Sequence, residues 1–359
     1  MIPNKTALKA LCMALTALPV FAQSWTLTPL WDLQPGSRTY LPAAPGDSAQ
    51  RGMDYNPISN HLLVASRTGG TFVHILNADT GADLGTLNTT GITGGTFAIS
   101  QIRVADDGAI YAANLTTDAN TSPLKIYRWA HEEAVPVLVY QGDPSNNDPA
   151  LNTAGAQINR RFGDNFDVRG AGTGTELVVG SRNGTVGAVL TTTDGINFSA
   201  TKVTTDAPVG AMGLAVTFGD GNTIFGDASG TATRLIGYDL AAGTGTLQTT
   251  YTIPNAVSLI DFDPANDLLA GISLNTGADT LALYDVSSGS AVLQDTKTFP
   301  ADVANSNGAG SVDFGNGRVY ALDANNGVLA FTVTQVPEPS TYALVGLGAA
   351  ALAFARRRR

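Results

Sequence analysis

Residues 259–272 read LIDFDPANDLLAGI, which is an apolar-polar-apolar triplet, a turn and a second apolar run. Successive side chains of a strand point to opposite faces, so the middle residue of the triplet points away from its two apolar neighbours. Six segments of the chain share this pattern. Their triplets are Met53-Asp54-Tyr55, Ile102-Arg103-Val104, Phe166-Asp167-Val168, Leu214-Ala215-Val216, Ile260-Asp261-Phe262 and Val312-Asp313-Phe314. This internal repetition predicts an all-β body built from similar units.

The spacing of the triplets indicates the architecture. Most of them lie about 50 residues apart, which is typical of the four-stranded blades of a β-propeller. One interval, between 102 and 166, is longer and contains the stretch GDPSNNDP at 142–149, which we interpret as a loop. We therefore expect a single propeller with six blades. The alternative is a seven-bladed ring in which that long interval contains a degenerate blade.

The two ends of the body are expected to complete one blade together. The sixth unit stops after its third strand, 327–333, whereas the lone strand 25–31 stands at the start of the body. Pairing these two strands would close the ring and protect both edges. Pro29 is compatible with an outermost strand, because proline is tolerated at a sheet edge.

The middle residues of the triplets should line the central channel of such a ring. They comprise four carboxylates, Asp54, Asp167, Asp261 and Asp313, together with Arg103 and Ala215. Carboxylates at this density attract a hard cation such as Ca²⁺. The alternative is that they form hydrogen bonds with the backbone of neighbouring blades or pair with Arg103. The residues alone leave both interpretations open.

The body contains few other residues that suggest a metal site, a catalytic site or a nucleic-acid interface. His61, His74 and His131 fall on separate segments and lack the spacing of metal ligands. We find no catalytic motif. The only cysteine, Cys12, lies in the N-terminal apolar segment, which excludes disulfides and thiol catalysis from the mature body. Residues 23–336 contain 14 basic and 29 acidic side chains, and this balance argues against a nucleic-acid partner.

The N-terminus has the three parts of a secretory signal peptide. Lys5 and Lys9 precede an apolar run from Ala10 to Phe21. The sequence Val20-Phe21-Ala22 supplies the small residues that signal peptidase needs at alternating positions, which favours cleavage between Ala22 and Gln23. We therefore predict a signal peptide at 1–22, followed by the propeller domain at 23–335.

The C-terminal residues 336–359 also have three parts. They are the motif Pro337-Glu338-Pro339, an uncharged segment at 341–355, and the basic tail Arg356, Arg357, Arg358 and Arg359. The two prolines favour extended backbone around Glu338, which suits a processing enzyme that binds extended substrates. The apolar segment is short for a transmembrane helix, but flanking arginines make a thin span tolerable. These arginines should stay cytoplasmic and leave the body outside.

This tail resembles the PEP-CTERM sorting signal of Gram-negative bacteria, which membrane-embedded exosortases recognise. The resemblance implies export across the inner membrane, a transient C-terminal membrane anchor, and final release at the cell surface or outside the cell. Exosortase substrates are associated with exopolysaccharide and biofilm production. The body resembles the quinoprotein or YVTN-type β-propellers of exported bacterial proteins over residues 25–333.

Two functions follow as expectations. The first is a non-enzymatic component of the cell envelope or exopolysaccharide matrix, which binds a polysaccharide or a surface protein. The alternative is an extracellular propeller hydrolase, similar to lactonases, which would use a divalent cation held by the channel carboxylates. Six-bladed lactonases usually add a glutamate and an asparagine at the metal, and the channel triplets here offer neither.

The three parts of the tail should act as one sorting unit. Deleting Arg356–Arg359 is expected to stall sorting, because the positive charges that hold the C-terminus in the cytoplasm are lost. Cell fractionation should then find the protein retained in the inner membrane or lost to the medium. Unchanged fractionation of the truncated protein would refute the sorting interpretation.

Overall fold

The computed structural model describes residues 24–43, 48–145, 160–228, 232–253, 257–274 and 277–336, together with Gly348. The predicted signal peptide with its cleavage position, the motif 337–339 and the basic tail 356–359 lie outside these residues, as does the 341–355 segment apart from Gly348. Within the described part of the chain, no helix is long and apolar enough to cross a membrane.

The described body is built from β-sheets, as predicted, with one short 3₁₀ helix at Gly172–Gly174. Three four-stranded sheets follow the order of the chain. Their strands are β2 (Gln50–Asn56), β3 (His61–Ser66), β4 (Phe72–Asn77) and β5 (Asp83–Thr86); β6 (Phe97–Val104), β7 (Ile110–Leu115), β8 (Leu124–Trp129) and β9 (Val137–Gly142); and β18 (Val257–Asp263), β19 (Leu268–Ser273), β20 (Thr280–Asp285) and β21 (Val292–Thr298).

A further sheet has eight strands, in the order β10-β11-β12-β13-β17-β16-β15-β14. Its halves are β10 (Asp167–Arg169), β11 (Glu176–Gly180), β12 (Val186–Thr192) and β13 (Phe198–Thr205), and β14 (Ala215–Phe218), β15 (Thr223–Asp227), β16 (Thr233–Asp239) and β17 (Thr244–Tyr251). The halves join only where the outermost strands β13 and β17 pair in parallel, at Thr204↔Thr244 and Thr205↔Gly245. Each half is otherwise an antiparallel meander like the other sheets.

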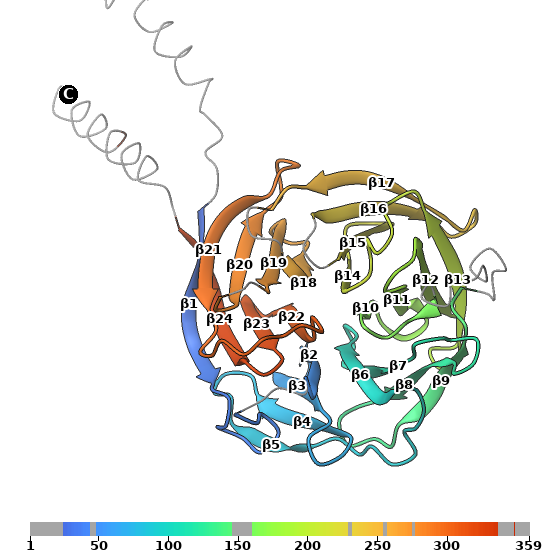
Figure 1. Cartoon of the computed structure of the whole chain (residues 1–359), viewed down its shortest axis with the longest axis horizontal. Coiled ribbons are helices and arrows are strands. Elements are labelled where there is room, and N and C mark those ends of the chain that lie inside the picture. Colours follow the sequence, from blue (N-terminus) through green and yellow to red (C-terminus); the bar gives the residue numbers. More distant parts are fainter. Residues whose placement is uncertain are drawn as a thin grey trace, which may run out of the picture. The chain divides into compact units, whose positions relative to one another are not determined.

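The remaining sheet contains both ends of the body, in the order β1-β24-β23-β22. Its strands are β1 (Ser24–Leu33), β22 (Gly310–Gly315), β23 (Arg318–Asp323) and β24 (Gly327–Val336). The predicted pairing of the lone N-terminal strand with the last strand is therefore confirmed. Figure 1 shows the sheets arranged around a common centre, with β2, β6, β10, β14, β18 and β22 innermost. The arrangement is that of a β-propeller.

The repeated pattern forms this arrangement through its hairpins. In the segment 259–272, Asp261 pairs with Ala270 and Phe262 with Leu269 across an antiparallel hairpin. The turn ends at Asp267, whose φ of 52° lies in the left-handed region. Asn60 and Asn316 take the same conformation in the corresponding turns, since Asn and Asp tolerate it better than most residues.

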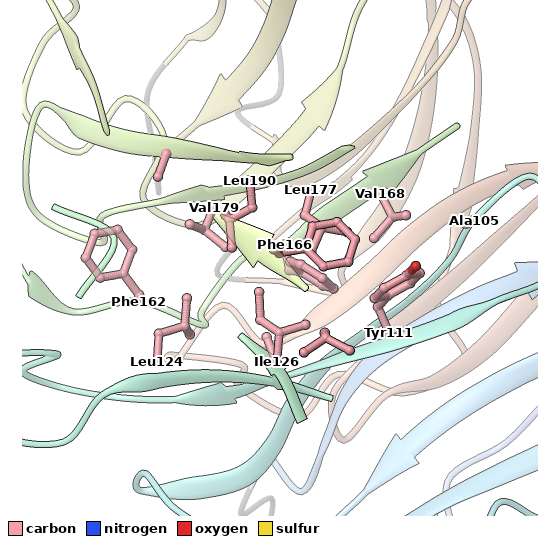
Figure 2. Close-up of a cluster of buried hydrophobic side chains, with 14 of the residues drawn as sticks. Ala105, Tyr111, Leu124, Ile126, Phe162, Phe166, Val168, Leu177, Val179 and Leu190 are labelled. Atoms are coloured by element: carbon pink, nitrogen blue, oxygen red, sulfur yellow. The ribbon is translucent and has the colours of Figure 1, made fainter. Parts of the chain in front are cut away.

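The core lies between neighbouring sheets. Apolar side chains of β7 and β8, such as Tyr111 and Ile126, pack against those of β11 and β12, such as Val179 and Leu190 (Figure 2). A similar cluster packs Met53 and Leu62 against Tyr320 and Leu322 of the sheet that contains β1 and β24. Each sheet thus buries both faces against its neighbours. The described residues between β9 and β10, namely 143–145 and 160–166, form no strand beyond an isolated bridge from Phe162 to Thr116.

Removal of the N-terminal strand should disrupt the body. Deleting residues 25–33 exposes the backbone donors and acceptors of β24 along a long edge, which is a template for aggregation. We expect soluble yield to fall sharply and the remaining protein to associate, as measured by size-exclusion chromatography with light scattering. A soluble monomer with the melting temperature of the full-length protein would contradict the role of β1 in closure.

Candidate functional site

The carboxylates of the channel lie between adjacent sheets rather than standing free. Each of these four ring carboxylates accepts a backbone N–H from a neighbouring inner strand. Val104 donates to Asp54 Oδ2 at 2.6 Å, Phe218 to Asp167 Oδ2 at 2.7 Å, Phe314 to Asp261 Oδ2 at 2.8 Å, and Tyr55 to Asp313 Oδ2 at 2.7 Å. These bonds satisfy donors on the channel side of β6, β14, β22 and β2, which have no strand partner there.

The fourth triplet was assigned two residues too early. The residue at the ring position of β14 is Thr217, not Ala215, and its Oγ1 donates to Asp261 Oδ1 at 2.8 Å. Ala215 is instead buried among the apolar side chains between β14 and β18. A shift of two residues leaves the alternation of faces unchanged. Of the two possible triplets, only Val216-Thr217-Phe218 has a polar middle residue, which is the sequence signal that favoured Thr217.

Arg103 takes the place of a carboxylate in the second sheet. Its Nε lies 3.6 Å from Asp54 Oδ1 and 3.7 Å from Asp167 Oδ1. Its Nη1 donates to the carbonyl oxygen of Met53 at 3.0 Å and to Ser311 Oγ at 2.7 Å. One guanidinium thus links three inner strands. Pairing with Arg103 was one of the alternatives that the sequence left open, and the structure shows it for Asp54 and Asp167.

Burial dominates the electrostatics of the ring. Desolvation raises the pKa of Asp54 and of Asp313 well above the usual value for aspartate. Burial and then the neighbouring Asp167 raise the pKa of Asp261 to about 6. Burial by itself would lower the pKa of Arg103, but Asp54 and Asp167 outweigh it and the net shift is upward. At mildly acidic pH, some of the ring carboxyl groups are therefore protonated and uncharged.

A cavity of about 510 Å³ opens at the end of the channel where the first two strands of each sheet are connected. The four ring carboxylates and Thr217 lie among its lining residues. Exposed residues of the connecting turns, including Asp106, Asp220 and Asn316, surround them. Tyr55, Phe218 and Phe262 also lie along the lining, but their side chains are buried in the core between the sheets, whereas Phe314 is half-buried. The result is an acidic cavity.

Arg169 is a cavity residue that the sequence analysis missed. Its guanidinium stacks over the Phe218 ring at 4.2 Å and binds Glu176 Oε2 at 2.6 Å. It also donates to the carbonyl oxygen of Gly221 at 2.7 Å. Arg169 directly follows the third triplet, where the inner strand reaches the cavity mouth, and this position in the repeat could have identified it. Its contact with Gly221 holds the β14–β15 turn against β10.

The donor set fits a metal poorly. Oδ2 of each ring carboxylate already accepts a backbone N–H. Oδ1 of Asp54 and of Asp167 faces Arg103, and Oδ1 of Asp261 accepts from Thr217. Calcium sites use several carboxylate and carbonyl oxygens that are free to coordinate. Among the described residues, no group of three or more His, Cys, Asp or Glu side chains is arranged to hold a metal ion.

The histidines lie apart from the cavity. His61 Nδ1 lies 2.7 Å from Glu132 Oε2, and the ring of His74 stacks on that of Tyr40 with centroids 3.7 Å apart. Neither side chain is among the cavity lining. The lining residues that the structure describes also include no cysteine, lysine or serine. The titratable groups of the cavity are thus carboxylates, one tyrosine and one arginine.

Comparison with protein families gives two matches. Residues 11–219, more than half of the chain, match the family described as "Domain of unknown function (DUF4623)". Residues 335–359 match the PEP-CTERM protein-sorting motif, which confirms the sorting signal predicted from the tail. The motif indicates an exported protein with membrane-anchored sorting at its C-terminus, and exosortases recognise it. A comparison with curated proteins finds no match.

Two solved structures with TM-scores above 0.5 support the fold. A structural genomics protein of unknown function from Bacteroides thetaiotaomicron has a TM-score of 0.52 at 12% identity, covering 87% of this chain and 76% of its own. A chain of a mitotic checkpoint complex has a TM-score of 0.53 at 13% identity, covering 90% of this chain and 98% of its own. A gluconolactonase from Xanthomonas campestris has a TM-score of 0.48 at 12% identity, covering 89% of this chain and 99% of its own. These likenesses carry no information about activity.

Substitutions at Asp261 should separate its hydrogen bonds from its charge. Asp261→Ala leaves the N–H of Phe314 without its acceptor and should cost about 1–3 kcal/mol in the free energy of unfolding. Asp261→Asn keeps an acceptor and should leave the fold intact. Because the pKa of Asp261 is raised in the folded state, its contribution to stability is present at pH 4 and lost as pH rises through about 6. Urea unfolding of the Asn variant should lack this part of the pH dependence.

Calcium provides the control for this experiment. If the carboxylates serve as hydrogen-bond acceptors between sheets, calcium should leave the melting temperature of the wild type unchanged. A rise of a few degrees that Asp261→Asn and Asp313→Asn abolish would instead make them cation ligands. A stability that is the same at pH 4 and pH 7 in both proteins would contradict the raised pKa.

Proposed function

The chain belongs to the family described as "Domain of unknown function (DUF4623)", and we propose that it is an exported, envelope-sorted binding protein without catalytic activity. Its ligand is a component of the cell surface or of an exopolysaccharide matrix. In this proposal, signal peptidase removes residues 1–22, residues 23–335 form a six-bladed propeller, and exosortase processes the tail at 336–359. The body then remains at the surface of a Gram-negative cell or leaves it.

The acidic cavity supports this proposal. It is open to solvent, and its volume of about 510 Å³ suits one or two sugar units rather than a macromolecule. Sugars offer hydroxyl donors to carboxylates and apolar C–H faces to aromatic rings. The lining combines the carboxylates with the half-buried Phe314. The excess of negative charge favours neutral sugars or amino sugars over uronic acids.

The contacts that the ring carboxylates already make within the protein favour a binding function over catalysis. A hydrolase that uses two carboxylates needs them free to exchange protons with substrate or water. Here Asp54, Asp167 and Asp261 each have Oδ2 in a hydrogen bond with a neighbouring inner strand and Oδ1 beside Arg103 or Thr217. In our proposal they act as structural links, and ligand contacts come from the exposed carboxylates at the mouth.

The mouth carboxylates offer a test that leaves the ring untouched. The double variant Asp106→Asn and Asp220→Asn removes two exposed charges from the cavity lining. Asp302→Asn, an exposed position outside the lining, is the matched control. Isothermal titration with glucosamine oligomers and with neutral glucose oligomers measures affinity. We expect the double variant to weaken glucosamine binding about tenfold or more, because charge-assisted hydrogen bonds are lost.

Two results would count against the proposal. Failure of both sugar classes to bind the wild type, or equal affinity in the double variant and the control, would remove the cavity as the binding site. Release of shortened oligomers or reducing ends from either probe would establish catalysis and favour the hydrolase alternative.

A further inference from the structure

A second charged cluster lies at the opposite ends of the inner strands. Arg51 stands three residues before Asp54 in β2, and Asp164 stands three residues before Asp167. The cavity residues Tyr55 and Val168 follow the ring positions instead. Arg51 and Asp164 therefore lie on the side of the ring away from the acidic cavity. None of the residues of this cluster belongs to a motif that the sequence revealed.

Three guanidinium groups surround the single carboxylate of Asp164. Arg161 binds it with two nitrogens, Nε to Oδ2 at 2.6 Å and Nη2 to Oδ1 at 2.7 Å. Arg51 Nη2 lies 3.4 Å from Oδ1 and Arg182 Nη1 lies 3.5 Å from it. Asp164 is buried, with 1% of its side chain exposed, and so is Arg51, with 5%. Arg161 and Arg182 reach solvent, with 32% and 20% exposed.

The positive charges of this cluster exceed its negative charge. The pKa of Arg51 is lowered to about 10, first by burial and then by the neighbouring Arg67, Arg161 and Arg182, with Asp164 opposing them. Arg67 lies nearby with its guanidinium 3.7 Å from the centre of the Phe97 ring. Burial and then Arg161 lower the pKa of Arg182. An added anion would relieve this repulsion between like charges.

We propose that Arg51, Arg161 and Arg182 form a binding site for an oxyanion at the end of the channel opposite the acidic cavity. The ligand group is a carboxylate or sulfate, carried by an acidic polysaccharide or supplied as a free ion. Guanidinium forks bind such groups with two parallel hydrogen bonds. Arg161 already donates two such hydrogen bonds, from Nε and Nη2, to the carboxylate of Asp164. Each guanidinium has five N–H donors, whereas Asp164 offers two oxygens.

The net negative charge of the protein does not prevent such binding. The chain carries a formal charge of −10. At physiological ionic strength, however, charges are screened beyond about 8 Å. An anion at the exposed guanidiniums of Arg161 and Arg182 therefore responds mainly to the local cluster. The two ends of the channel thus select ligands of opposite charge.

Titration with three probes at matched ionic strength tests the site: galacturonate oligomers, sodium sulfate and neutral glucose oligomers. We expect galacturonate oligomers and sulfate to bind the wild type. The double variant Arg161→Gln and Arg182→Gln should weaken both at least tenfold. Arg182→Gln alone is the milder variant, because the Arg182 side chain lies 3.4 Å or more from both Asp164 and the carbonyl oxygen of Asn307. Circular dichroism checks that each variant folds.

The outcomes distinguish the source of the ligand and the two ends of the channel. Oligomer binding much tighter than sulfate binding assigns the site to a polysaccharide, and equal affinities assign it to a free ion. The variant Asp106→Asn with Asp220→Asn should leave anion binding unchanged, so this site can be present even if the cavity binds no sugar. Absence of anion binding to the wild type, or undiminished binding to folded Arg182→Gln and to the double variant, would overturn the proposal.

Discussion

The hydrogen bond from a backbone N–H of one inner strand to an aspartate of the preceding inner strand is the interaction on which this structure depends. Inner strands of a propeller have a channel-facing edge whose donors need partners. Asp54, Asp167, Asp261 and Asp313 supply them at 2.6–2.8 Å. Burying carboxylates is costly, as their raised pKa values show, and pairing each donor offsets part of that cost because an unpaired buried donor costs about 1–3 kcal/mol.

This use of the carboxylates shapes the function we propose. Because they link neighbouring sheets, the acidic ring is a rigid floor to the cavity rather than a set of free catalytic groups. The ligand-contacting residues then belong to the turns above it, which carry Asp106 and Asp220. At the other end of the same strands, guanidinium groups gather around Asp164. One stack of inner strands therefore presents two chemically opposite surfaces.

Much of this fold was predictable from local pattern, since the triplets identified the inner strands and the orphan strand identified the closure through β1 and β24. The error at Ala215 arose because a shift of two residues preserves strand alternation. The acceptor role of the ring carboxylates stood only as one alternative, since pattern cannot measure the distance between strands. Arg51, Arg161 and Arg182 come from distant segments with no shared motif, so only the folded chain brings them together.

Hydrogen exchange of four backbone amides tests the central claim most directly. These are the amides that donate to the ring carboxylates, namely Tyr55, Val104, Phe218 and Phe314. Measured by NMR on the mature body, they should exchange as slowly as amides paired between strands, and Asp261→Ala should accelerate exchange at Phe314 far more than at Val104. Exchange of all four at the rate of exposed turn amides, in the wild type, would contradict the account.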